Sequence, residues 1–164
     1  MKNIVLIGMP GAGKSTIGVL LAKSMLYSFV DTDLLIQNEH GQSLCDIIDS
    51  VGTDAFLKIE NDVICGCEFK RSVIATGGSA VYGSEAMKKL KESSVFVYLN
   101  LPLSEIERRL GDIHTRGVAM KNGTTVAELY DERKPLYEKY ADIDLHCSGL
   151  TAEQCVDRII DMMK

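Results

Sequence analysis

The residues from Gly8 to Ser15 form a glycine-rich loop of the type that binds phosphate. They read Gly-Met-Pro-Gly-Ala-Gly-Lys-Ser and fit the pattern G-x-x-x-x-G-K-[ST]. In this pattern the glycines let backbone N–H groups point at phosphate oxygens. We expect Lys14 to reach the β- and γ-phosphates of a nucleotide and the Ser15 hydroxyl to bind Mg²⁺. The alternative is a glycine-rich turn that binds nothing.

The segments on either side of this loop favour the phosphate site. An apolar run at 3–7 precedes it, and a helical pattern at 16–25 follows it directly. This order matters because the N-terminus of the following helix adds its dipole to the anion site. The predicted nucleotide-binding residues of the loop are Gly8, Gly11, Ala12, Gly13, Lys14, Ser15 and Thr16.

Two carboxylates, Asp31 and Asp33, follow a short apolar segment at 28–30. In an open α/β sheet, ligands bind beyond the carboxyl ends of the strands, so both acids should face the crevice that holds the phosphates. Phosphoryl transfer needs a group that orients the acceptor hydroxyl and takes its proton, and it needs acidic support for Mg²⁺. Asp33 suits the first role and Asp31 the second. The alternative for Asp33 is that it only caps the next helix.

Glycines and arginines further along the chain extend the predicted site. Thr76-Gly77-Gly78-Ser79 follows an apolar run at 72–75, and paired glycines allow a ligand to approach the backbone closely. A simple turn is the alternative. Arg116 and Arg133 are either exposed surface charges or bidentate donors to a transferring phosphoryl group or an acceptor carboxylate.

The hydrophobic pattern predicts an α/β fold in one domain of 164 residues. Strand-like runs alternate with segments of helical spacing, which indicates a five-stranded parallel sheet covered by helices on both faces, in three layers. The irregular stretch 111–123 is the candidate lid. The predicted strands are 3–7, 28–30, 72–75, 95–99 and 143–145, and the predicted helices are 15–26, 33–38, 43–49, 53–68, 84–91, 103–110, 124–139 and 151–163.

The composition of the chain argues against some classes of binding partner and indicates the cellular compartment. A net charge of −5 gives no broad basic face, which argues against nucleic acid as a partner. No apolar run approaches the ~20 residues of a membrane span, and the short apolar start runs straight into the phosphate loop instead of forming a signal peptide. The five cysteines are an odd number beside a nucleotide motif, so we expect reduced thiols and a cytoplasmic protein.

Taken together, the motifs resemble those of the shikimate kinase family, whose members use ATP and Mg²⁺ to phosphorylate a hydroxyl of shikimate. The resemblance spans residues 3 to about 163. The matching motifs are Gly8–Thr16, Asp31-Thr32-Asp33, Phe56-Leu57-Lys58-Ile59-Glu60, Gly77-Gly78-Ser79, Arg116, and Arg133-Lys134-Pro135-Leu136-Tyr137 followed by Ala141.

This resemblance implies a P-loop fold of the nucleoside-monophosphate-kinase type, with acceptor-binding helices at about 33–60 and a lid at about 111–123. We separately expect a monomer. Asp33 would contact the acceptor hydroxyls and Arg133 would bind the acceptor carboxylate. Arg116 would close over the phosphates and acceptor, and Arg109 would lie near the adenine. The implied acceptor-binding residues are Asp33, Glu60, Gly77, Gly78, Ser79 and Arg133, and the implied catalytic residues are Lys14, Asp33 and Arg116.

Three positions depart from the family pattern, all on the acceptor side or in the lid. Leu57 stands where the family has an arginine that binds the shikimate carboxylate, and Lys58 points about 100° away on a helix. Ser79 replaces the third glycine, and 116–119 reads Arg-Gly-Val-Ala where the family has Arg-Pro-Leu-Leu. Losing one charge-assisted hydrogen bond to an anion costs about 1.5–3 kcal/mol.

These departures leave the acceptor open. Shikimate is the favoured single acceptor for an ATP-dependent kinase of this kind. A second hypothesis keeps the reaction and changes the acceptor to another small hydroxy compound, such as a sugar acid or a hydroxy-amino acid. A third hypothesis is a nucleotide-binding regulator without phosphotransfer. Retention of Lys14, Asp33, Arg116 and Arg133 argues against this third hypothesis.

Overall fold

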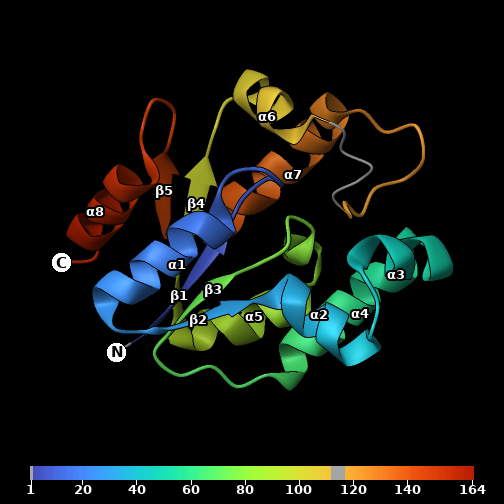
Figure 1. Ribbon diagram of the computed structural model, residues 1–164, viewed down its shortest axis with the longest axis horizontal. Coiled ribbons are helices and arrows are strands. Elements are labelled where there is room, and N and C mark those ends of the chain that lie inside the picture. Colours follow the sequence, from blue (N-terminus) through green and yellow to red (C-terminus); the bar gives the residue numbers. More distant parts are fainter. Residues whose placement is uncertain (1, 112–116) are drawn as a thin grey trace.

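The computed structural model describes residues 2–111 and 117–164 and has a five-stranded parallel sheet at its centre (Figure 1). The strand order is β2-β3-β1-β4-β5, so the first strand lies in the middle. Val5 is the register partner of Ile74 on one side and of Phe96 on the other. The strands are β1 (Asn3–Ile7), β2 (Ser28–Asp31), β3 (Ser72–Ala75), β4 (Ser94–Asn100) and β5 (Ile143–His146).

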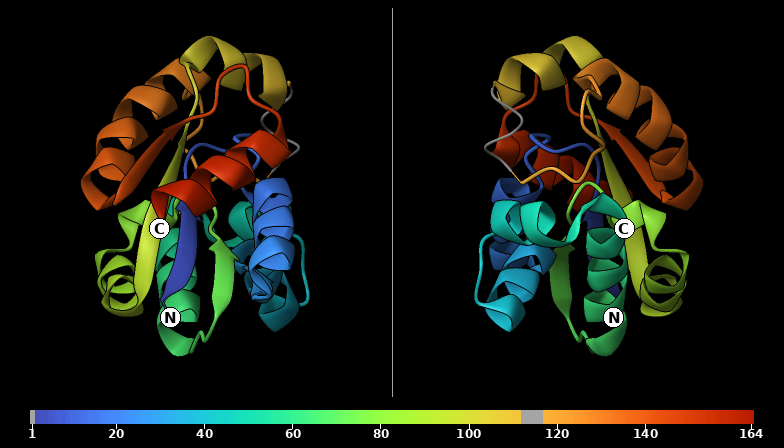
Figure 2. Two further views of the ribbon diagram at one scale, coloured as in Figure 1. Left: turned by 90° about the vertical axis from the view of Figure 1, so that its left-hand side faces the viewer. Right: turned by 90° about the vertical axis from the view of Figure 1, so that its right-hand side faces the viewer.

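Helices cover both faces of the sheet and make the predicted three layers (Figure 2). The first and last helices, α1 and α8, pack together on one face, and α5 and α7 lie on the other, where α4 packs against α5. The helices are α1 (Lys14–Met25), α2 (Thr32–His40), α3 (Leu44–Val51), α4 (Thr53–Gly66), α5 (Ser84–Ser93), α6 (Leu103–Leu110), α7 (Val126–Tyr140) and α8 (Ala152–Met162), with a 3₁₀ turn, η1, at Ala80–Tyr82. Within the described ranges, no helix is long and apolar enough to cross a membrane.

Burial explains why the central strands read as continuous apolar runs. All five residues of β1 are buried, as are the four of β3, because helices cover both of their faces. The five predicted strands are confirmed. The predicted helices form with ends that shift by up to two residues; for example, α7 starts at Val126 and not at 124, because Thr125 caps it.

A second, smaller apolar cluster lies apart from the sheet. It joins the helices α2, α3 and α4 to the described part of the candidate lid, and its buried members are Ile36, Leu44, Ile47, Phe56, Val63 and Ala119. This cluster packs the predicted acceptor-binding helices into one unit beside the sheet. Of the candidate lid, residues 112–116 lie outside the described residues, and so does Arg116.

The cap of α7 gives a stability prediction. Thr125 accepts from the Glu128 N–H at 3.1 Å, while the Glu128 carboxylate accepts from the Thr125 N–H at 3.3 Å. Thr125→Ala leaves the Glu128 N–H without its capping oxygen, so we expect a loss of about 1 kcal/mol in the free energy of unfolding by urea. Thr124→Ala is the matched control. Equal stability of the two variants would contradict the capping role.

Candidate active site

The phosphate loop connects the carboxyl end of β1 to α1, and it borders a cavity that is described below. Gly13 caps α1 in the left-handed conformation, at φ 95°, which a residue with a side chain adopts only with strain. The Lys14 ammonium lies over this loop and donates to the carbonyls of Gly8 at 2.7 Å and Met9 at 2.8 Å. Burial lowers the pKa of Lys14 to about 8, against the opposing effect of Asp33. A nucleotide phosphate beside this ammonium would raise its pKa again, because an anion favours the charged form.

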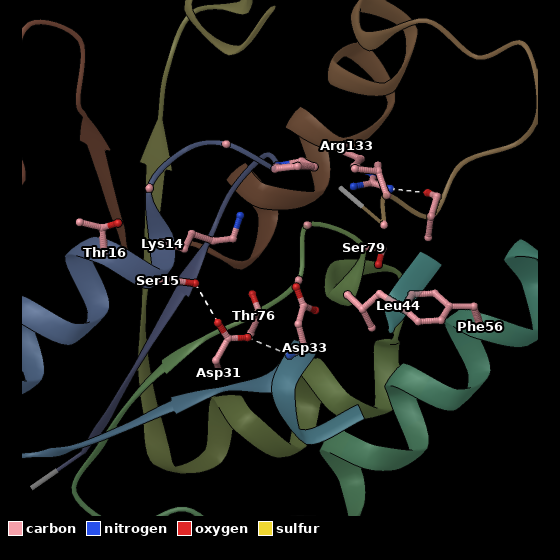
Figure 3. Close-up of a pocket in the computed structure, with 18 residues that line it drawn as sticks. Lys14, Ser15, Thr16, Asp31, Asp33, Leu44, Phe56, Thr76, Ser79 and Arg133 are labelled. Atoms are coloured by element: carbon pink, nitrogen blue, oxygen red, sulfur yellow. Dashed lines mark hydrogen bonds between the residues drawn. The ribbon is translucent and has the colours of Figure 1, made fainter. Parts of the chain in front are cut away.

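Ser15 and Asp31, the two predicted Mg²⁺ ligands, are in direct contact. The Ser15 hydroxyl donates to Asp31 Oδ2 at 2.8 Å (Figure 3). Hydroxyl and carboxylate oxygens are the hard ligands that Mg²⁺ prefers, and Mg²⁺ is usually held by one or two such groups together with substrate phosphates. This donor pair fits that cation. The described residues contain no cluster of three or more His, Cys, Asp or Glu side chains that would hold a metal without phosphates.

The carboxylate of Asp33 is not the helix cap. Asp31 Oδ1 accepts from the Asp33 N–H at 2.9 Å, so Asp31 caps α2 and the capping alternative for Asp33 is wrong. Asp33 lines the cavity instead. Burial and the neighbouring Asp31 raise its pKa to about 6, with Lys14 acting in the opposite direction. Asp33 is therefore ionised above about pH 6 and able to accept a proton.

A cavity of about 360 Å³ unites most of the predicted residues (Figure 3). It lies between the phosphate loop, α2, the loop after β3, the chain at 117–119 and α7. Its walls include the predicted residues Gly11, Gly13, Lys14, Ser15, Thr16, Asp31, Asp33, Gly77, Gly78, Ser79 and Arg133. The predicted residues Gly8, Ala12, Glu60 and Arg109 do not line it.

Arg133 enters the cavity from α7 and is only 1% exposed. Its Nη2 donates to the Ala119 carbonyl at 2.6 Å, and its guanidinium lies 5.4 Å from the centroid of the Tyr82 ring. Its Nε has no hydrogen-bond partner in the described structure. A buried guanidinium with an unused donor suits a bound anion such as a carboxylate.

The loop after β3 lies against this arginine and needs its glycines. A Cβ on Gly78 would lie 2.8 Å from Pro10 and 2.9 Å from Arg133 Nη1, so a side chain there would displace one of them. The Tyr137 hydroxyl fixes the loop by donating to the Gly78 carbonyl at 2.6 Å. Sequence reasoning missed Tyr137 as a site residue, because an apolar aromatic ring on a helix is typical of the core.

Ser79, which replaces the third glycine of the family pattern, lines the main cavity with its hydroxyl hydrogen-bonded to α4. Its hydroxyl donates to Glu60 Oε1 at 2.7 Å, which holds the oxygen against α4. Glu60 itself is 2% exposed, and its second oxygen, Oε2, has no hydrogen-bond partner among the described residues. The family departure at Ser79 thus creates a buried hydrogen bond at the cavity wall.

Arg109 lies at a separate cavity of about 210 Å³, on the other side of the phosphate loop. Its Nη1 donates to the carbonyls of Gly11 at 3.4 Å and Ala12 at 3.5 Å, and its Nη2 pairs with Glu105 at 2.9 Å. The other walls are Ala12, Gly13, Thr16, Ile17, Cys147, Leu150, Ala152 and Cys155. This position is compatible with a nucleotide base whose phosphates occupy the loop.

On the acceptor side, the residues that line the main cavity differ in part from the predicted ones. Leu57 does not line the main cavity but a neighbouring one of about 280 Å³, together with Tyr82 and Glu132. Leu44 and Phe56 do line the main cavity and were not predicted as site residues. Their apolar periodicity does not separate them from core residues, because apolar side chains on amphipathic helices normally face the core; Phe56 alone carries a signal, as the first residue of the matching motif 56–60.

The fold and the site together define a P-loop phosphotransferase that acts on a small molecule. A phosphate loop, a hydroxyl–carboxylate pair of the kind that suits Mg²⁺, a carboxylate that can take a proton and a buried arginine all border one cavity. Comparison with known proteins agrees with this class. Residues 10–164 match the family model described as shikimate kinase.

Individual relatives give the same result. The chain is 39% identical to the shikimate kinase of Thermodesulfovibrio yellowstonii over 98% of this chain and 94% of that protein. A solved structure, shikimate kinase from Acinetobacter baumannii in complex with shikimate, has a TM-score of 0.91 at 27% identity and covers 99% of this chain and 93% of that one. The chain belongs to the shikimate kinase family, whose members are ATP-dependent phosphotransferases with an alcohol acceptor.

Some relatives have a different name. The chain is 31% identical to threonine synthase-like 1 of Pongo abelii, over 99% of this chain but only 22% of that protein. The same kind of sequence therefore occurs inside a longer protein as well as in chains of this length.

Proposed function

We propose that this protein transfers the γ-phosphoryl group of ATP to a hydroxyl of shikimate, giving ADP and shikimate 3-phosphate. The observation that carries this proposal is the placement of Asp33 and Arg133 on the walls of one cavity with Lys14. An acceptor whose carboxylate is bound by Arg133 would present a hydroxyl near Asp33, beside the phosphate loop. Membership of the shikimate kinase family supports the same acceptor, because Asp33 and Arg133 occupy the positions that the family resemblance assigns to acceptor binding.

On the nucleotide side, the loop N–H groups and Lys14 bind the phosphates, and Arg109 borders the base. Ser15 and Asp31 are the residues that would hold Mg²⁺, which supplies charge neutralisation for the phosphates when bound. Lys14 must leave the carbonyls of Gly8 and Met9 to reach a phosphate, and the anion is the stronger partner for an ammonium.

On the acceptor side, Asp33 orients the hydroxyl and accepts its proton as the oxygen attacks the phosphorus. Catalysis comes from positioning and from electrostatic stabilisation of the in-line transfer. Arg116, which lies outside the described residues, belongs to this proposal as a lid group that closes over the phosphates. We further propose that the enzyme works as a monomer in the cytoplasm, with its five cysteines reduced.

The test is release of ADP from ATP and Mg²⁺, coupled to oxidation of NADH, with and without shikimate. We expect turnover that depends on shikimate. The control without Mg²⁺ is measured by direct quantification of ADP, because the coupling enzymes also need Mg²⁺, and it should show no ADP release. The product is identified by ³¹P NMR as a phosphate monoester. Absence of shikimate-dependent turnover in a folded protein that binds ATP would reject shikimate as the acceptor.

A second candidate acceptor, a hydroxy-amino acid, is favoured by Leu57. The expected second arginine for the shikimate carboxylate is absent there, and one relative is named for threonine chemistry. A smaller acceptor with one carboxylate needs only Arg133. The same assay with L-serine and L-homoserine in place of shikimate separates the two candidates by their kcat/KM.

Placing an arginine at position 57, where the family has one, tests whether the acceptor is shikimate or a smaller hydroxy-amino acid. Leu57→Arg should lower the KM for shikimate by about tenfold, because it adds one charge-assisted hydrogen bond to the carboxylate. Ala119 borders both the cavity of Leu57 and the main cavity, so a long side chain has a short path between them. Leu57→Met is the uncharged control. A KM that stays unchanged in the arginine variant would favour the smaller acceptor.

A further inference from the structure

Glu60 is a buried carboxyl group for which the mechanism above has no use. It lies on α4 behind the loop that follows β3 and does not border the main cavity. The Ser79 hydroxyl satisfies one of its oxygens, and the other, Oε2, has no hydrogen-bond partner among the described residues. A buried polar atom without a partner is rare and calls for an explanation.

The unpartnered oxygen faces Asp33 across Gly77. The position that a Cβ on Gly77 would take lies 2.7 Å from Glu60 Oε2 and 2.6 Å from Asp33 Oδ1. Both carboxyl groups therefore reach the space that a side chain at position 77 would occupy, and the glycine leaves that space open. Neither has an ion-pair partner within 4.0 Å in the parts of the chain that the structure describes. Two carboxyl groups this close do not ionise independently.

Three charged groups and one hydroxyl act on the ionisation of Glu60. Asp33 on α2 disfavours its ionised form, while Lys14 on α1, Arg133 on α7 and the Ser79 hydroxyl favour it. Asp31 on β2 acts on Asp33. Burial is the largest effect and raises the pKa of Glu60 to about 7.

We propose that Glu60 is a positioning residue that controls acceptor binding through its charge, and that Ser79 tunes this control through its hydrogen bond. When Glu60 is neutral, Arg133 presents an excess of positive charge to an anionic acceptor. When Glu60 is ionised, its charge opposes the acceptor carboxylate and weakens binding. The inference rests on the proposed function, because it requires an acceptor that carries a carboxylate.

The sign of the pH dependence follows by linkage. Binding of an anion favours the protonated form of Glu60, so acceptor binding takes up a proton above about pH 7. The KM for shikimate should therefore rise with pH between 6.5 and 8, with a slope that approaches tenfold per pH unit. Saturating MgATP holds the nucleotide side of the site constant across this range.

Two variants and one control test the inference. Glu60→Gln should keep the KM for shikimate flat between pH 6.5 and 8. Ser79→Ala removes a donor that stabilises the carboxylate, so the rise should move to higher pH. Glu39→Gln, which changes an exposed carboxyl on α2, should behave as the wild type. Thermal melting checks that each variant is folded, and Ser79→Ala carries the test if Glu60→Gln is not.

Calorimetry supplies a readout that does not depend on turnover. Binding heats of shikimate to the MgADP complex, measured at pH 7.5 in buffers of different ionisation enthalpy, report the protons taken up. We expect proton uptake in the wild type and none in Glu60→Gln. A wild-type KM that is independent of pH, or equal slopes in wild type and Glu60→Gln, would overturn the inference. Absence of shikimate turnover or binding in every protein would instead reject the proposed acceptor.

Discussion

Asp33→Asn should lower kcat for shikimate phosphorylation by roughly 10²–10⁴-fold while leaving ATP affinity nearly unchanged. The amide keeps the shape of the carboxylate but cannot accept the hydroxyl proton, and general-base catalysis contributes an effect of that size. ATP binds through the phosphate loop and Lys14, which this substitution leaves in place. Steady-state kinetics with both substrates varied, together with ATP titration by calorimetry, measures both quantities.

The wild-type pH profile provides a second test of the same role. Because the pKa of Asp33 is raised to about 6, kcat should fall as the pH drops through 6 and this residue becomes protonated. Asp157→Asn, on the exposed side of α8, is the matched control and should keep the wild-type rate. A rate in Asp33→Asn within a few-fold of the wild type would exclude Asp33 as the base.

Arg133→Met should raise the KM for shikimate by about 100-fold or more, with a much smaller effect on the KM for ATP. Methionine fills part of the volume but offers no donor, so the acceptor carboxylate loses two charge-assisted hydrogen bonds at about 1.5–3 kcal/mol each. The Ala119 carbonyl also loses its partner at 2.6 Å, and we expect a loss of about 1–3 kcal/mol in stability. Kinetics below the melting temperature separates the two effects.

Arg108→Met is the control for this substitution. Arg108 lies on α6 with a largely exposed side chain and a surface ion pair to Glu105 at 3.5 Å, so its loss should change neither KM. Arg133→Lys adds a graded comparison, because an ammonium cannot make the bidentate contact and should recover only part of the affinity. An increased KM for ATP with an unchanged KM for shikimate would place Arg133 on the nucleotide side instead.

Local patterns explain why the nucleotide half of the site was predictable. The glycine loop, Lys14 and Ser15 are contiguous, and the strand before them and the helix after them follow from short-range periodicity. Asp31 was predictable because parallel strands bring their carboxyl ends to one edge. Its hydrogen bond to Ser15 at 2.8 Å follows from that geometry.

The acceptor half was harder to predict because its walls come from distant segments. Leu44 and Phe56 border the cavity although apolar residues on amphipathic helices usually lie in the core. Leu57 is next to Phe56 in sequence but borders a different cavity, because neighbouring positions on a helix point in different directions. The packing of α3, α4 and the chain at 117–119 decides which of these apolar side chains border the main cavity.

The sequence by itself determined the class of reaction, the family and the order of strands and helices, because these depend on contiguous motifs and local hydrophobic periodicity. The tertiary structure decided which carboxylate caps α2, where the Ser79 hydroxyl is held, and how close Glu60 comes to Asp33. These features depend on contacts between residues 19 or more positions apart, or on the direction of a side chain at a helix terminus. Such contacts arise from the packing of the whole chain, and no local pattern encodes them.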